Sequence, residues 1–397
     1  MTEDAALKRR IGPGLLTAYG VGVMVGAGIY VLVGAVAGNA GVWAPLSFLV
    51  AGLIAAPTAL AYAEFSTRYP EAAGEAAYVG SGLSSGALAL LVGIAIIASG
   101  TVSAGAVLRG GVGYLTNIIG IEANVAIVAL GLLLTGTAVI GVLESLSLVA
   151  VFTAIELGGL ALVIWAGMTA QPSADWAVPS APVLTGIGFG AVLAFFAFIG
   201  FEDIVNMAEE VDRPSRTLPL AILASLGITS VIYALVAIAA VRAVPLADLA
   251  GSRGPLALVW QAARGGDAAF LSGIAVFAAL NGVLAQIVMA ARVLFGLGRR
   301  NPAFAVFHKA HPRFGTPVLG TVLIGAAVIL SSLFVPFTTL AELTSAILLA
   351  VFVLVNLALI FEKRRAPAAA FRVPAAVPVL GLVLSLAALA TAIGGLA

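Results

Sequence analysis

Long apolar segments, separated by short polar stretches, recur along the whole chain. Each segment is about 20 residues long, which lets a helix cross about 30 Å of hydrocarbon. The alternating segments of about ten residues that a membrane β-barrel requires do not occur in the sequence. The pattern therefore predicts an all-α polytopic membrane protein with eleven spanning helices, at residues 12–38, 43–67, 86–108, 124–141, 146–168, 184–207, 218–243, 269–297, 317–335, 339–361 and 375–396.

Turn-forming residues mark the connections, including Tyr69-Pro70, Arg213-Pro214 and Asn301-Pro302. The connections are too short for a soluble module, so we expect a single integral membrane domain over residues 1–397. The polar start, Thr2 to Arg10, is not followed by a small-residue cleavage site. The first apolar segment is therefore expected to remain as a spanning helix.

Lysine and arginine are distributed unevenly between the two sides of the predicted membrane. With a cytoplasmic N-terminus, fifteen of the nineteen lie inside, and the outer four are Arg109, Arg242, Arg253 and Arg264. Positively charged residues favour the cytoplasmic side. We therefore expect a multi-pass protein of the cell membrane with its N-terminus in the cytoplasm, and the odd number of spans places the C-terminus outside.

The segment from Gly20 to Gly38 is apolar but rich in glycine, with Gly26-Ala27-Gly28 near the midpoint of its span. Glycine weakens a helix, and an opened helix turns free N–H and C=O groups toward whatever occupies the space. The segment has two interpretations: half of a small-molecule binding site, or a surface for close helix packing. Small residues four apart, the packing signature, occur at Gly22 and Gly26 and at Gly34 and Gly38.

A second break is predicted in the sixth span, at Gly200. An apolar half, Ile187 to Ile199, precedes this glycine, and Glu202 and Asp203 follow it. Carboxylates inside a span are costly, so they should face a cavity, a partner or water. Broken helices in corresponding positions are typical of transporters with inverted repeats, and the second break favours a binding site over packing for the first.

The composition narrows the functional classes. The chain is 62% hydrophobic and 9% charged and contains no cysteine, which excludes disulfides and thiolate metal sites. Its two histidines, His308 and His311, lie in a predicted loop, so an intramembrane enzyme is not expected. No Walker-type phosphate loop occurs. We predict no catalytic residues, metal, cofactor or nucleic-acid partner.

Four stretches resemble the amino acid, polyamine and organocation (APC) transporter superfamily, of the amino acid permease type. GVGVMVGAGIY, at residues 20–30, is similar to its first-span signature, and FFAFIGFEDIVNMAEEVDRPSRTLPL, at residues 195–220, to its sixth span and following loop. The similarity extends to residues 61–78 and 281–317. The resemblance implies a LeuT-type fold with five plus five inverted helices, here residues 1–168 and 184–361, followed by an extra helix at 375–396.

The resemblance also implies that a substrate lies between spans one and six. In the family, the substrate carboxylate meets backbone N–H groups of the first break and the amine meets carbonyls at both breaks. Helix N-termini favour anions and C-terminal ends favour cations, so a zwitterion fits both poles. The implied substrate-binding residues are Val25, Gly26, Ala27, Gly28, Ile29, Phe195, Phe196, Ala197, Phe198, Ile199 and Gly200.

Two aromatic residues of the sixth span, Phe196 and Phe198, have competing interpretations. Aromatic residues of an apolar span usually serve packing. Phe196, however, is similar in position to the aromatic gate that covers the substrate in the family. We therefore assign the gate to Phe196 before Phe198.

Glu156 is an isolated charge in the fifth span, where many proton-coupled relatives have a lysine. We interpret it as a protonatable group near the site; the alternatives are a neutral carboxyl bonding another helix and a charge that attracts a cationic substrate. Glu202 either holds the loop after the break or transfers protons. Because residues 273–298 contain no serine or threonine, the sequence favours proton over sodium coupling.

Other polar residues are expected to have structural roles. Glu64 and Arg68 should form a pair at the cytoplasmic end of span two, while Asn281 and Gln286 either line the pathway or bond another helix. The segment Lys8 to Arg10 is expected to move at the inner gate. A solvated cytoplasmic latch is expected from Glu209, Glu210, Asp212, Arg213 and Arg216.

The sequence thus predicts a secondary active transporter of amino acids that works by alternating access, as a proton-coupled symporter or as an exchanger (antiporter). Its expected partners are a small-molecule substrate, the proton and the lipid bilayer. Two alternatives remain: a polyamine or organocation transporter, and an amino acid sensor on the same scaffold that does not transport.

Overall fold

The computed structural model describes residues 11–70, 74–116, 118–140, 146–208 and 210–396, and within these ranges the regular elements are helices. Lys8, Arg9, Arg10 and Glu209, which were assigned to the inner gate and the latch, lie outside the described residues.

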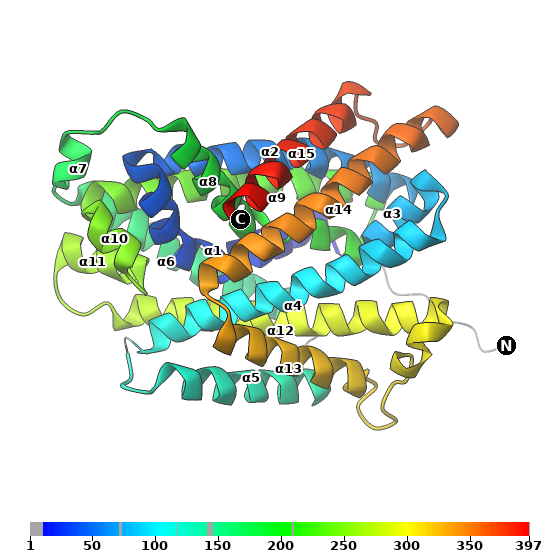
Figure 1. Cartoon of the computed structure of the whole chain (residues 1–397), viewed down its shortest axis with the longest axis horizontal. Coiled ribbons are helices and arrows are strands. Elements are labelled where there is room, and N and C mark those ends of the chain that lie inside the picture. The colour runs from blue at the N-terminus through cyan, green and yellow to red at the C-terminus, as the bar shows by residue number, and fades with distance from the viewer. Residues whose placement is uncertain (1–10, 71–73, 117, 141–145, 209, 397) are drawn as a thin grey trace.

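The long helices follow the predicted spans closely. Each predicted span coincides with one long helix or, for the sixth, with three short ones in succession (Figure 1). The elements are α1 (Pro13–Ala40), η1 (Gly41–Trp43), α2 (Ala44–Arg68), α3 (Gly74–Leu83), α4 (Gly86–Thr116), α5 (Ala123–Ile140), α6 (Leu146–Thr169), α7 (Ala174–Ala177), α8 (Leu184–Phe195), η2 (Phe196–Phe198), η3 (Glu202–Met207), α9 (Pro214–Ala243), α10 (Leu246–Gly251), α11 (Pro255–Arg264), α12 (Ala269–Arg300), η4 (Pro302–Phe307), α13 (Val318–Phe334), α14 (Phe337–Arg365) and α15 (Ala376–Leu396).

Nine helical stretches of the described chain are long and apolar enough to cross a membrane. One of them, Gly28–Arg68, joins the second part of α1 to α2 through η1, and therefore holds parts of two predicted spans. The shorter apolar helices Pro13–Gly26 and Val318–Phe334 supply the first half of α1 and all of α13. The chain is thus a polytopic helical membrane protein.

The third span is longer than predicted, because Arg109 does not end it. This residue was expected in an outer connection, yet it lies inside α4, which continues to Thr116. Its guanidinium donates to the carbonyl of Ser332 in the last turns of α13. A cation at a helix C-terminus satisfies carbonyls that have no partner within their own helix, so the charge is accommodated within the helix pair.

Short helices that the sequence did not reveal occupy the connections. In Figure 1, α7, α10 and α11 gather at one end of the molecule, whereas α3 lies at the other. α10 packs on the second half of α1, where a Cβ at Gly34 would lie 2.5 Å from the Leu249 carbonyl oxygen and one at Gly38 would lie 3.2 Å from Ala250. These two glycines are therefore packing contacts, as the small-residue spacing indicated.

A buried ion-pair network fastens the end of the molecule opposite α10 and α11. The carboxylate of Glu64, on α2, lies 2.6 Å from Arg68 and 2.6 Å from Lys363 of α14, and the Glu64 side chain is fully buried. The same carboxylate accepts the Val373 backbone N–H at 2.9 Å. The predicted pair of Glu64 and Arg68 is confirmed, and Lys363 extends it to the connection before α15.

We expect Lys363→Met to destabilise the protein, because it removes one of the two cations beside a buried carboxylate. Breaking a buried pair costs about 3–5 kcal/mol, and the remaining Arg68 should keep the loss near the lower figure. The measurement is the apparent melting temperature in detergent. Arg213→Met is the control, because Arg213 and Asp212 lie 3.9 Å apart on the surface and such pairs contribute about 0–1 kcal/mol. Equal shifts in the two variants would contradict a stabilising network.

Candidate functional site

The first break lies inside α1 at Gly26. Its backbone dihedral angles, φ −17° and ψ −160°, are not helical, although helix precedes and follows it. No heavy atom outside its immediate neighbours lies within 4 Å of where a Cβ would stand on this glycine. The break therefore adjoins open space, and its displaced backbone can offer polar groups to a ligand.

The second break begins where α8 ends, at Phe195, and passes through η2 to Gly200. Ile199 is extended, and Gly200 has φ +125°, a conformation that essentially only glycine adopts without strain. A Cβ on Gly200 would lie 2.7 Å from a methyl group of Val23 and 3.1 Å from the Val23 carbonyl carbon. Glycine is thus required here both for its dihedral angle and for the approach of α1.

This break starts four residues earlier than predicted, and a 3₁₀-helix follows it. The sequence placed an apolar half-helix up to Ile199, whereas the structure ends α8 at Phe195 and begins η3 at Glu202. The Gly200 N–H donates to the Glu202 carboxylate at 2.9 Å instead of to a carbonyl of the preceding turn. Glu202 therefore holds the loop conformation, which is one of its two predicted roles.

The two breaks touch each other. A Cβ on Gly28 would lie 3.2 Å from the Cα of Ala197. The hydroxyl of Tyr233, on α9, lies 2.6 Å from the Met24 carbonyl oxygen and 2.7 Å from the Ala197 carbonyl oxygen. The hydroxyl has one proton and donates to one carbonyl at a time. Because it is within hydrogen-bond distance of both carbonyls, it bridges the two breaks.

Sequence reasoning missed Tyr233. The available signal was a tyrosine inside an apolar span, because a buried hydroxyl requires a hydrogen-bond partner where water is absent. Its partners lie 209 and 36 residues away in the chain, so no local pattern could name them.

The aromatic residues of the second break face different neighbours. Phe196 is 4% exposed, and its ring contacts Phe337 of α14 edge to face with centroids 6.4 Å apart. Phe198 instead packs on Tyr233 at 5.1 Å and covers Gly52 of α2. Phe196 thus connects the break to a helix of another part of the bundle, while Phe198 supports Tyr233.

Glu156 lies on α6 beside the first break. Its side chain is buried, and the hydroxyl of Tyr30, four residues after Gly26, donates to the Glu156 backbone carbonyl at 2.9 Å. Among the hydrogen bonds and ion pairs of the described residues, none involves the Glu156 carboxyl. Glu156 thus lies at the contact between α6 and the second half of α1.

Glu75 of α3, a carboxyl that the sequence did not single out, lies near Asp203, which follows the second break. It is buried, and the Tyr62 hydroxyl lies 3.4 Å from it. Burial raises the pKa of Glu75 to about 7, and the nearby charge of Asp203 also raises it. The buried residues Glu75 and Glu202 and the half-buried Asp203 thus form an acidic group beyond Gly200.

The start of α1 is fastened to the chain that follows η3. Ile11 donates its N–H to the Glu210 carbonyl at 3.1 Å and accepts from the Asp212 N–H at 3.0 Å. This contact is made by backbone groups. The side chains of Asp212, Arg213 and Arg216, which were assigned to the latch, are exposed, and Arg213 lies 3.9 Å from Asp212.

Of the two amides expected near the pathway, Gln286 is the more informative. Its Oε1 atom is buried without a hydrogen-bond partner and lies 3.0 Å from where a Cβ on Gly100 of α4 would stand. Asn281 is half-buried one and a half turns earlier on α12. Among the described residues, the Gln286 Oε1 atom thus faces α4 without a donor.

Comparison with known proteins identifies the family. The amino acid permease family model matches residues 15–396. The chain is 29% identical to the branched-chain amino acid permease BcaP of Bacillus subtilis over 95% of this chain and 86% of that protein. It is 28% identical to the methylthioribose transporter of the same organism, over 96% and 87%. It is 30% identical to human cationic amino acid transporter 4, over 87% of this chain and 58% of that protein. The chain, with its all-α polytopic fold, belongs to the amino acid permease family of the APC superfamily.

Proposed function

We propose that this protein is a secondary active transporter that carries amino acids by alternating access, with the substrate held between the breaks at Gly26 and at Phe196 to Gly200. The observation that carries the proposal is the junction of the two breaks through Tyr233, beside the open space at Gly26. A junction of unwound segments offers both donors and acceptors of the backbone at one place.

The polarity of this junction suits a zwitterion. The N–H groups that begin the second half of α1, from Ala27 to Ile29, favour a carboxylate, because a helix N-terminus carries partial positive charge. Carbonyls that end the first half of α1 and end α8, including those of Val25 and Phe195, favour an ammonium. Selectivity for the amino acid backbone then requires no charged side chain.

Coupling to protons is assigned to Glu156. Its carboxyl is buried beside the first break and has no partner among the described residues, so a proton is the simplest means of neutralising it. Glu202 has a structural bond to Gly200, and this gives it a positioning role. The described part of α12 after Ser272 offers no hydroxyl ligand, which favours protons over sodium.

A carrier of cationic amines is the second candidate. The carboxyl of Glu156 could meet a substrate ammonium instead of a proton, and no cationic side chain of the described residues competes for it. The relatives bear names for branched-chain amino acids, for cationic amino acids and for methylthioribose, so the family accommodates more than one substrate class. Competition by amines that lack a carboxylate separates the two candidates.

The N-terminus is placed in the cytoplasm of a cell-membrane protein, because fifteen of the nineteen lysine and arginine residues then lie on the cytoplasmic side. Residues 1–168 and 184–361 are assigned to two inverted repeats of five spans each, and α15 to an additional span.

Gly28→Val should abolish uptake. Its Cβ would lie 3.2 Å from the Ala197 backbone, so the two added methyl groups must push α1 away from η2. We expect uptake of isoleucine and lysine into proteoliposomes to fall at least about tenfold, a loss of about 1.4 kcal/mol or more. Gly227→Val on α9, where nothing lies within 4 Å, is the control. Wild-type uptake by the Gly28 variant would remove this contact from the site.

Tyr233→Phe tests the bridge between the breaks. Loss of the hydroxyl leaves carbonyls of Met24 and Ala197 without a donor, and an unsatisfied buried group costs about 1–3 kcal/mol. We expect KM for the transported amino acid to rise about tenfold, measured from initial uptake rates. A lower melting temperature with an unchanged KM would instead indicate a purely structural role.

Glu156→Gln should uncouple uptake from the proton gradient, because glutamine fills the same space but does not titrate. We expect accumulation driven by an acid exterior to disappear in proteoliposomes while exchange of internal for external substrate persists. Glu122→Gln is the control, since Glu122 is exposed and caps the start of α5. Unchanged gradient-driven accumulation in the Glu156 variant, or a requirement for sodium at constant pH, would contradict proton coupling through this residue.

A further inference from the structure

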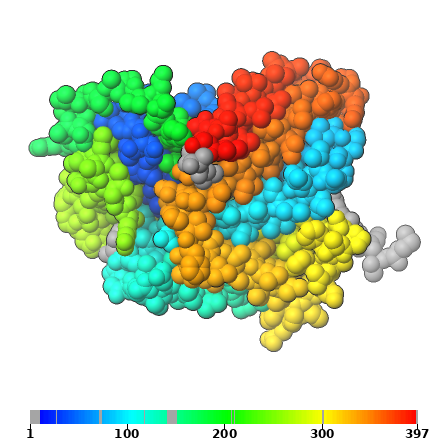
Figure 2. Space-filling model, viewed as in Figure 1, coloured from blue at the N-terminus to red at the C-terminus, as the bar shows by residue number. Residues whose placement is uncertain are grey.

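A cavity of about 350 Å³ lies apart from the junction of the two breaks, among α1, α8, α14 and α15. Its volume is in the range of small-molecule sites. Figure 2 shows the blue end of α1, the green α8 and the orange and red helices α14 and α15 meeting on one face of the molecule. Its lining residues are Asn39, Phe189, Val192, Leu193, Glu342, Thr391, Ala392 and Gly394.

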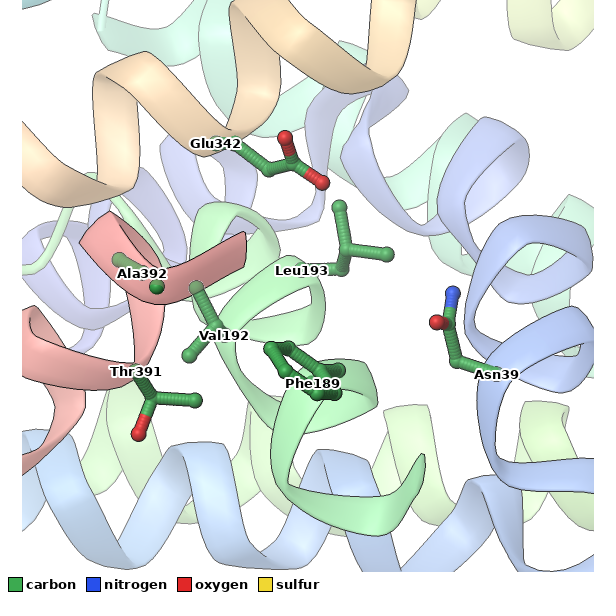
Figure 3. Close-up of a pocket in the computed structure, with 8 residues that line it drawn as sticks. Asn39, Phe189, Val192, Leu193, Glu342, Thr391 and Ala392 are labelled. Carbon is green, nitrogen blue, oxygen red and sulfur yellow. The ribbon is translucent and has the colours of Figure 1, made fainter. Parts of the chain in front are cut away.

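Glu342 is the one ionisable residue in this lining. Its side chain extends from α14 into the space, toward Leu193 and across from Asn39 (Figure 3). Among the described residues, no hydrogen bond or ion pair involves its carboxyl. A charged side chain within a spanning segment is expensive unless it faces water or a partner, and is therefore a candidate for function.

The neutral polar groups of the cavity add acceptors. The Asn39 amide donates to the Ala35 carbonyl at 2.9 Å, and the Thr391 hydroxyl donates its proton to Ala387 at 3.0 Å. The Asn39 carbonyl oxygen and the Thr391 oxygen therefore stay available beside the carboxylate. An acceptor-rich lining with a negative charge suits a group that carries several donors and a positive charge.

The apolar part of the lining determines the kind of cation. Phe189, Val192 and Leu193 present hydrocarbon along one side, which suits the methylene stem of a lysine-like molecule. A bare metal ion would need oxygen ligands on all sides at short distances. The acceptors here come from separate helices around a space much larger than an ion, so the chemistry favours an organic cation.

The cavity is adjacent to the gate assigned to Phe196. Leu193 of α8 lies three residues before Phe196, and Glu342 lies five residues after Phe337, whose ring contacts Phe196. Glu342 also lies near the start of α14, whereas Lys363, Arg364 and Arg365 lie at its other end. On the proposed orientation, the cavity is on the outer side of Phe196.

We propose that this cavity is an outer subsite that binds an ammonium or guanidinium group on a flexible aliphatic chain, with Glu342 as the counter-charge. The binding itself follows from the lining. Its place on the entry route of the substrate rests on the proposed transport function. A cationic amino acid and the ethanolamine headgroup of a lipid share this chemistry.

Binding of radiolabelled lysine to the purified full-length protein in dodecyl maltoside tests the subsite. The Gly28→Val background removes the central contact, so the lysine that remains bound reports on the outer cavity. Adding Glu342→Gln should weaken this binding at least tenfold. Asp267→Asn is the control and should not weaken it, because it removes an exposed charge from the loop before α12 but keeps the oxygen that caps this helix. Isoleucine, which has no cationic side chain, should not compete.

Three results would overturn the subsite. The first is no lysine binding in the Gly28→Val background, and the second is equal binding with and without Glu342. The third is displacement of lysine by sodium chloride when choline chloride at the same ionic strength does not displace it. Phosphatidylethanolamine added to the micelles identifies the source of the cation. Displacement of lysine by this lipid, but not by phosphatidylglycerol, assigns the subsite to a headgroup, and retention of lysine assigns it to a soluble amine. Failure of amino acid uptake in proteoliposomes would contradict the proposed function while leaving lysine binding at Glu342 intact.

Discussion

The architecture depends on keeping two interrupted helices side by side in an environment without water. Each interruption leaves backbone groups that hydrocarbon cannot satisfy, so the interruptions persist only where another part of the chain supplies partners. Tyr233 provides such a partner from α9 to both sides at once. The absence of side chains at Gly28 and Gly200 then lets the backbones approach closely enough for one hydroxyl to reach both.

Around this junction, aromatic residues provide packing and acidic residues provide the ionisable groups. Large buried rings, such as Phe198 against Tyr233 and Phe195 against Phe352, fix the orientation of the second break. Acidic residues lie on either side of it: Glu156 next to the first break, and Glu202 with Glu75 beyond Gly200. Three basic residues have partners away from this junction: Arg109, inside α4, donates to a carbonyl of α13, and Arg68 and Lys363, at helix ends, pair with Glu64. The centre is therefore left acidic, which is compatible with protons and with amines.

The sequence was informative where the determining pattern is local. Hydropathy located every span, although the third ends eight residues later than predicted, because about 20 apolar residues have no other stable arrangement in a chain this apolar. The break at Gly26 was also readable, since glycine acts through its own backbone. Arg109, Tyr233 and Lys363 were not readable: their partners are between 36 and 299 residues distant, and only the folded bundle brings them together. Glu75 escaped notice because its burial results from the packing of α3.

The backbone bridge between Ile11 and Val211 has a mechanical consequence. It joins the start of α1 to the chain just past η3, while the non-helical residues Gly26 and Gly200 interrupt the same two segments nearer the middle of the molecule. Two arms that are linked at their free ends and hinged at their other ends can swing only in concert. An opening movement on this side would thus carry both half-helices together. Because the link consists of N–H and C=O groups, side-chain variation at Ile11 or Val211 would leave that linkage in place.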